Sequence, residues 1–141
     1  ARYLRAAFVP QGSAVSTEAL HESYSTDIFL SIPPGLSKDV AVKTFKAETT
    51  GRFKPVSFSF GVSNQGNCHV DIDASIGITD SKGESVRDIR LSDRNTRILP
   101  GLTRTFTLED SQGFESGAYN CDLTVKIGKT KTLISKYTLK I

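Results

Sequence analysis

The sequence predicts an all-β chain folded as an antiparallel β-sandwich, with a separate strand at its N-terminal end. Three observations lead to this prediction. Apolar and polar residues alternate over most of the chain, which is the period of a half-buried strand and not of a helix. Turns rich in Gly, Asn, Asp and Pro separate these segments at short intervals. A length of 141 residues fits one domain with an appended arm, and we expect about seven to nine strands.

The chain is expected to divide into an N-terminal arm, residues 1–25, and a sandwich, residues 26–141. The arm begins with a strand over residues 2–9. The apolar positions that share one face of this strand are Leu4, Ala6 and Phe8. Residues 11–25 are small and polar and are expected to form a loop. The sandwich begins with an alternating segment at residues 28–32.

The middle of the chain carries the clearest strand patterns. A strand starts at residues 40–42, and the next covers residues 56–63, where Val, Phe, Phe and Val alternate with small residues. A turn at residues 64–67 follows. Apolar residues then alternate from residue 68 to residue 78, which predicts a long strand with a clear inner and outer face. Residues 80–83 form the turn that ends it.

Four further strands are expected in the second half of the chain. The first of them, within residues 86–91, is short and irregular. The others cover residues 102–108, 119–127 and 133–141. A Pro-Gly pair precedes the first of these three, and a hairpin-like break at residues 128–130 separates the last two.

Composition excludes several classes of function. The chain has 18 basic and 15 acidic residues, and its net charge of +3 is dispersed. The sequence has no run of Lys and Arg residues that would indicate nucleic-acid binding. It also has no stretch of about 18 apolar residues that would indicate a membrane span. The chain contains no methionine, so we expect either an N-terminus produced by processing, as by removal of a signal peptide, or a fragment. We therefore expect an extracellular or cell-surface protein.

Residues suited to catalysis are sparse. The only histidines are His21, in the expected arm, and His69, on a strand face. The sequence has no G-x-S-x-G elbow, glycine-rich phosphate loop or His pair with metal-ligand spacing. Cys121 is expected to face inward and so to be a poor nucleophile. We predict that the chain is not an enzyme, and that it has no cofactor.

One outer strand face has a pattern that resembles a metal site. Its alternating residues are His69, Asp71 and Asp73. Alternate strand residues lie about 7 Å apart, which is long for three ligands of one ion. A solvated face with Lys126 or Asn120 as strand neighbours is the better interpretation, and residues 80–84 are expected to be a turn and not a calcium loop. No metal site is predicted.

The order of motifs after residue 26 resembles a known family. Residues 55–66 are similar to the strand followed by Asn-x-Gly that opens prokaryotic cell-surface immunoglobulin-like modules. Residues 78–83 resemble their I-x-D-x-x-G hairpin, residues 98–101 their hydrophobic-Pro-Gly segment, and residues 117–119 their G-x-Y start of strand F. Such modules include the C-terminal immunoglobulin-like domains of WxL-interacting and adhesive surface proteins. The resemblance implies an immunoglobulin-like sandwich.

A second resemblance concerns strand F of true immunoglobulin domains. Residues 115–121 resemble their D-x-G-x-Y-x-C segment, and Tyr119 stands where a tyrosine corner is found. The chain departs from that pattern in two ways. Phe58 and Phe60 occupy the core positions of strand B, where the partner cysteine is expected, and the chain has no tryptophan.

The two cysteines, Cys68 and Cys121, fit either one disulfide in an oxidising compartment or two buried thiols. Each shares a strand face with apolar residues, so both are expected to point inward. A disulfide would stabilise the fold by about 4 kcal/mol, because it closes a long loop. We favour the Cys68–Cys121 disulfide, and two buried free thiols are the alternative.

The N-terminal strand suggests how the protein acts. A detached strand bearing Leu4, Ala6 and Phe8 would add to the sheet edge of another subunit. Head-to-tail exchange of this kind gives fibres, as in fimbrial subunits. The alternatives are strand A of the chain's own sandwich, or the last strand of a preceding domain.

We therefore predict a non-enzymatic structural or adhesive protein, a pilus-like filament subunit or a stalk module. Its expected partners are other protein subunits, including copies of itself, or cell-surface proteins, with no nucleic acid and no insertion into a membrane. The alternative is a periplasmic chaperone-like or ligand-binding module of a larger surface protein. Periplasmic pilus chaperones have two such domains, and this chain has the length of one.

Overall fold

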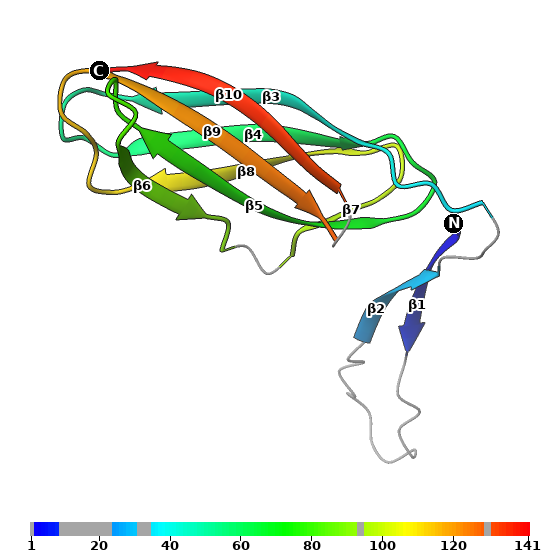
Figure 1. The fold of residues 1–141 in the computed structure, drawn as a ribbon. Coiled ribbons are helices and arrows are strands. Elements are labelled where there is room, and N and C mark those ends of the chain that lie inside the picture. The colour runs from blue at the N-terminus through cyan, green and yellow to red at the C-terminus, as the bar shows by residue number, and fades with distance from the viewer. Residues whose placement is uncertain (1, 9–23, 31–34, 93–94, 129–130) are drawn as a thin grey trace, which may run out of the picture. The chain divides into compact units, whose positions relative to one another are not determined.

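The computed structural model describes residues 2–8, 24–30, 35–92, 95–128 and 131–141 (Figure 1). Every regular element in these ranges is a β-strand, and the chain divides into two compact units, Ala1–Leu36 and Ser37–Ile141. Within the described ranges there is no helix with the length and apolar character needed to cross a membrane.

The N-terminal unit contains a two-stranded antiparallel sheet. Strand β1 (Arg2–Phe8) pairs along its whole length with β2 (Tyr24–Leu30). The strand expected at the start of the chain is confirmed. The strand expected near residues 28–32 begins earlier and pairs with β1, so the unit boundary lies after Leu36 and not after residue 25. The rest of the expected loop lies outside the described residues.

The second unit is an antiparallel sandwich of eight strands, which confirms the predicted fold class (Figure 1). One sheet has the order β3-β4-β8, formed by Val40–Thr49, Val56–Asn64 and Thr103–Asp110. The other has the order β10-β9-β5-β6, formed by Lys131–Lys140, Ala118–Ile127, Val70–Thr79 and Ser85–Arg90. The two-residue strand β7 (Arg97–Ile98), which the sequence analysis did not predict, pairs with the start of β5.

The core lies between the two sheets and follows the predicted alternation. The inward residues of β4 are completely buried: Val56, Phe58, Phe60 and Val62. Those of β5 and β9 that face them are also buried: Val70, Ile72, Ala74, Ile76, Ile78, Cys121, Leu123, Val125 and Ile127. The stacked rings of Phe60 and Phe106 join neighbouring strands, with centroids 5.5 Å apart. Burial of these apolar side chains is the main stabilising contribution to the unit.

Two side-chain contacts connect the two sheets at the sides of the sandwich. Between β3 and β10, the rings of Phe45 and Tyr137 meet edge to face at 5.8 Å. Between β6 and β8, Arg87 forms an ion pair with the buried carboxylate of Asp110. The same guanidinium lies 5.1 Å from the ring centre of Phe114.

Asn64, fully buried at the end of β4, ties three segments together. Its amide nitrogen Nδ2 donates to the carbonyl oxygens of Cys68, at 2.8 Å, and Ile98, at 3.0 Å. Its oxygen Oδ1 accepts from the backbone nitrogen of Gly66 at 3.0 Å. Its own backbone nitrogen donates to the carbonyl of Leu102 at 2.9 Å. The side chain thus fixes both the turn into β5 and the link from β7 to β8.

Gly66 allows this turn to lie against the segment that leads into β3. A Cβ at this position would collide with the carbonyl oxygen of Ser37 and the backbone nitrogen of Asp39. The close approach permits backbone bonds from Gln65 to Asp39, 2.7 Å, and from Asn67 to Ser37, 3.0 Å. The predicted turn at residues 64–67 is therefore specified by a buried amide and a close backbone contact.

Replacing Asn64 by Asp is expected to destabilise the fold strongly. The change keeps an acceptor for Gly66 but places a second oxygen against the carbonyls of Cys68 and Ile98. Losing both donors in a buried site should lower the free energy of unfolding by about 3–5 kcal/mol. Urea denaturation at neutral pH measures this loss.

The matched control is Asn67→Asp. The Oδ1 of Asn67 accepts from the backbone nitrogen of Ser37 at 2.7 Å in an exposed position, and a carboxylate can do the same. This variant is expected to lose less than about 1 kcal/mol. Equal, small losses in both variants would contradict the role assigned to Asn64.

Candidate functional site

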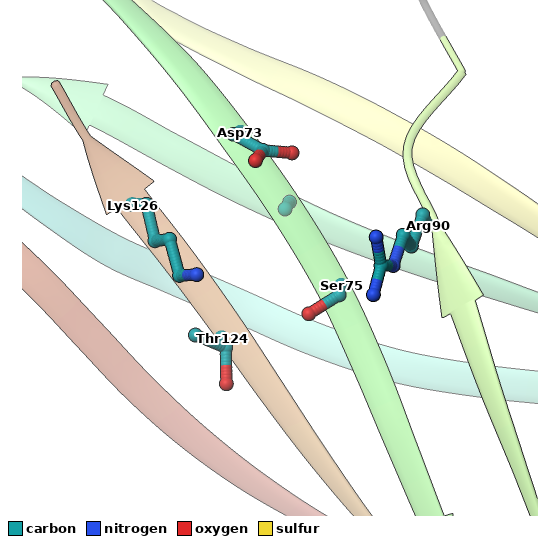
Figure 2. Close-up of a pocket in the computed structure, with 6 residues that line it drawn as sticks. Asp73, Ser75, Arg90, Thr124 and Lys126 are labelled. Carbon is teal, nitrogen blue, oxygen red and sulfur yellow. The ribbon is translucent and has the colours of Figure 1, made fainter.

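The outer face of the sheet that contains β10, β9, β5 and β6 carries an open hollow between β6, β5 and β9. It is lined by Asp73, Ala74, Ser75, Arg90, Thr124 and Lys126 (Figure 2). The strand register builds it, because Ser75 lies directly opposite both Arg90 and Thr124. One step along the strands, Asp73 lies opposite Lys126. The hollow therefore groups two cations, two hydroxyls and one carboxylate.

The two cations reach over the hollow from opposite sides. Figure 2 shows the guanidinium of Arg90 and the ammonium of Lys126 directed toward one another, with the hydroxyl of Ser75 between them. Arg90 lies 3.9 Å from the carboxylate of Asp88, and the two side chains are 81% and 56% exposed. An ion pair this long and this exposed is weak, so the guanidinium is available to a ligand.

The neighbouring row of the same face is acidic and flat. Gly77 is the next outward position of β5, and it lies opposite Asp88 on one side and Asp122 on the other. A Cβ at Gly77 would meet no atom within 4 Å, so the surface above it is open. Asp122 lies 3.9 Å from the ammonium of Lys136. No single stretch of sequence predicts this site, because its members come from three strands, and only the alternation of outward polar residues signals it.

The H-x-D-x-D pattern is part of a solvated strand face. Asp71 binds Arg97 through two hydrogen bonds, Nε to Oδ1 at 2.9 Å and Nη2 to Oδ2 at 3.1 Å. The hydrogen bond with Asp71 raises the pKa of Arg97, against a smaller opposing effect of burial. Asp73 lies opposite Lys126, as expected. Among the residues that the structure describes, no group of three or more His, Cys, Asp or Glu side chains could hold a metal.

The turn between β5 and β6 is organised by Asp80. Its Oδ1 accepts from the backbone nitrogens of Lys82, at 2.8 Å, and Glu84, at 2.9 Å. Gly83 adopts a φ of 85°, which favours glycine. The carboxylate is thus used within the turn, which confirms the interpretation of residues 80–84 as a turn.

The favoured Cys68–Cys121 disulfide is wrong for this structure, in which both cysteines are buried free thiols. Strands β5 and β9 are neighbours, but the register places Cys121 opposite Ile78, at the far end of β5 from Cys68. At a rise of about 3.3 Å per residue, the two cysteines lie roughly 30 Å apart, and a disulfide requires Cα atoms within about 7 Å. The Sγ of Cys68 instead donates to the carbonyl of Ser37 at 3.3 Å.

The tyrosine corner expected at Tyr119 is present. Its hydroxyl donates to the carbonyl oxygen of Glu115 at 3.2 Å, and its ring lies 5.0 Å from that of Phe114. This contact orients the loop that enters β9. It agrees with the immunoglobulin-like character implied by residues 115–121.

The residues of the proposed donor strand lie in β1. Leu4, Ala6 and Phe8 occupy positions opposite Ile28, Thr26 and Tyr24 of β2 in the antiparallel pairing. Strand β1 belongs to neither sheet of the sandwich, so it is not strand A of this unit. Exchange with another subunit and membership of a preceding domain both stay predictions.

The four outer strands of the sandwich differ in how well their edges are protected. Strand β3 contains a register shift between Val42 and Thr44, β6 has six residues, and β10 carries three lysines. Bulges, short length and lysines all discourage pairing with further strands. Strand β8 has none of these features: it has eight residues, no lysine or proline, and an unbroken register with β4.

The hydrogen-bond phase of β8 shows which of its backbone groups face outward. The bond from the Asn64 nitrogen to the Leu102 oxygen, together with the register that places Ser63 opposite Thr103, shows that Leu102 is on the side of the ladder that bonds β4. Alternate residues of β8 make the hydrogen bonds to β4, so the N–H and C=O groups of the residues between them point away from β4. These outward residues are Thr103, Thr105, Thr107 and Glu109. The edge lies beside a second open hollow that Glu109 and Asp110 help to line.

Comparisons with known proteins agree with this architecture. No model of a protein family matches the chain, and no curated protein matches it. A solved structure of Bacteroides uniformis β-glucuronidase is similar with a TM-score of 0.52 and 16% identity, over 72% of this chain and 12% of the glucuronidase. The C-terminal domain of Wzt is similar with a TM-score of 0.51 and 12% identity, over 77% of this chain and 75% of the other. At these identities the likeness shows the fold alone, an immunoglobulin-like β-sandwich.

The free state of both cysteines leads to a direct prediction. Burial raises the pKa of the Cys121 thiol to about 11, so very little reactive thiolate exists near pH 8. Protein purified without reductant should react slowly with an aromatic disulfide reagent when native. It should release two thiol equivalents when unfolded in guanidinium chloride.

Single Cys68→Ala and Cys121→Ala variants provide the control, since each should release one equivalent on unfolding. Reductant should leave the melting temperature of the unsubstituted chain unchanged. Fewer than two thiols in the unfolded, unreduced monomer would show that a disulfide forms.

Proposed function

We propose that the chain is a non-enzymatic structural module of the extracellular or cell-surface class that assembles with other protein subunits by β-strand addition. The observation that carries this proposal is the sheet formed by β1 and β2, which has two strands and belongs to a unit separate from the sandwich. A two-stranded hairpin is at best marginally stable in water. Pairing with a further sheet edge would stabilise it.

The edge of β8 is the best acceptor for such a strand. Immunoglobulin-like sandwiches of the constant type have a fourth strand, D, paired with the strand that corresponds to β8, whereas among the strands that the structure describes the present sheet ends at β8. The outward backbone groups at Thr103, Thr105, Thr107 and Glu109 pair with none of the described strands and would bond an added strand.

Assembly of this kind requires a hairpin that donates a strand and an open edge that accepts it. Another copy of the chain meets both requirements, because each copy supplies one hairpin and one open β8 edge. The contact is heterologous, so repetition gives a filament unless the rotation closes a ring. A ligand-binding module of a larger surface protein is the second candidate function, and the polar hollow on the outer face favours it.

Assembly is tested by light scattering coupled to size-exclusion chromatography, together with negative-stain microscopy. The full chain should form oligomers or filaments, and residues 37–141 should stay monomeric. The shorter chain keeps every buried apolar side chain described for the sandwich and should fold. If the full chain is also monomeric at high concentration, the assembly proposal fails.

A pair of substitutions at Thr105 tests the β8 edge. Thr105→Pro removes one outward N–H and adds a ring at the edge, while the ladder to β4 stays intact. Thr105→Val keeps the N–H and a β-branched side chain of similar size. We expect the proline variant alone to prevent assembly without a large change in melting temperature. Filaments from both variants would show that β8 is not the acceptor.

A further inference from the structure

We propose that the hollow on the outer face of β5, β6 and β9 binds a hydroxylated carboxylic acid, with a sugar acid as the ligand class. This inference goes beyond the assembly proposal and does not depend on it. The site is the hollow lined by Ser75, Arg90, Thr124 and Lys126, extended over the open surface of Gly77.

The carboxylate of the ligand is recognised by the two cations. Arg90 offers a planar fork of donors that matches a carboxylate, and Lys126 offers a point charge from the opposite side (Figure 2). The hydroxyls of Ser75 and Thr124 lie between them on facing positions of β5 and β9. A single negative group placed here would neutralise two positive charges whose own carboxylate neighbours hold them weakly, because Arg90 has only a long, exposed ion pair with Asp88 and Lys126 lies opposite the exposed Asp73.

The hydroxyl groups of the ligand are recognised by the carboxylates around the hollow. Asp73 lies one step along β5 on one side, and Asp88 and Asp122 flank Gly77 on the other. Ionised carboxylates accept hydrogen bonds and donate none, so they select ligand groups that donate. The glycine leaves a flat floor, because nothing lies within 4 Å of a Cβ built there.

This alternation of charge favours a compact acid with hydroxyls over two other ligand types. A linear polyanion would place negative groups against Asp73 or Asp122. A neutral sugar would leave both cations without a partner, and the lining contains no aromatic ring on which it could stack. The open position of the hollow predicts weak binding, with a dissociation constant on the order of millimolar.

The test is a titration of the ¹⁵N-labelled chain with D-galacturonate, D-galactose and acetate, followed by NMR. Galacturonate should give saturable shifts at the amides of Ser75, Gly77 and Thr124. Acetate should bind at least tenfold more weakly, because it lacks hydroxyls, and galactose should not saturate. Absence of saturable galacturonate binding would overturn the proposal, and so would equal affinities for acetate and galacturonate.

Two substitutions of exposed cations distinguish binding at the hollow from a general effect of surface charge. Arg90→Ala should weaken galacturonate binding at least tenfold. Lys140→Ala removes the same charge from an exposed position of β10, opposite Ala118 and away from Asp122 and the hollow, and should change the affinity less than twofold. Equal effects of the two substitutions would overturn the assignment of Arg90.

Gly77→Val tests where the hydroxylated part of the ligand lies. A Cβ at this position meets no atom within 4 Å and valine suits a strand, so the variant should fold. It should weaken galacturonate binding at least tenfold and leave acetate binding unchanged. Unchanged galacturonate affinity would show that the ligand does not extend over Gly77.

Discussion

The buried amide of Asn64 is the interaction on which the rest of the sandwich depends. A polar side chain with no exposure to water is tolerated in the core only when its hydrogen bonds are made, and here donors and acceptor are all used. Its partners belong to the turn into β5 and to the link between β7 and β8, and these segments lead into different sheets. One side chain therefore holds the two layers in a fixed relation, which apolar contacts alone do not specify.

Both candidate sites depend on the register of the strands. The hollow exists because Ser75 faces Arg90 and Thr124 in neighbouring strands. A shift of β5 by one residue in its register would point Ser75 and Gly77 toward the core and expose Ile76 to solvent. The open edge of β8 likewise depends on the phase set where Asn64 meets Leu102. A rigid sandwich with a polar outer face and one unprotected edge is suited to association, and both sites use groups that point away from the core.

The sequence predicted those features that depend on a single strand. Alternation located the strands of the sandwich and placed Cys68 and Cys121 inside. The resemblance of residues 115–121 to strand F of immunoglobulin domains identified the corner at Tyr119. Alternation could not predict pairing between strands. The predicted Cys68–Cys121 disulfide was wrong because alternation does not determine the register between neighbouring strands. In this structure Cys121 lies opposite Ile78. Strand β7 is too short to show an alternation. The segment of β2 alternates like a strand of the sandwich, but it pairs with β1. The hollow needs three strands in register, so no single stretch of sequence contains it.

Hydrogen–deuterium exchange at β8 shows whether this strand receives a strand from another chain. In residues 37–141 alone, the outward amides of Thr103, Thr105, Thr107 and Glu109 should exchange quickly, while the amides bonded to β4 stay protected. In the assembled full chain, the outward amides should become protected as well, and a peptide covering residues 103–110 should take up correspondingly less deuterium. Equal uptake by that peptide in both samples, with the full chain assembled, would contradict the account.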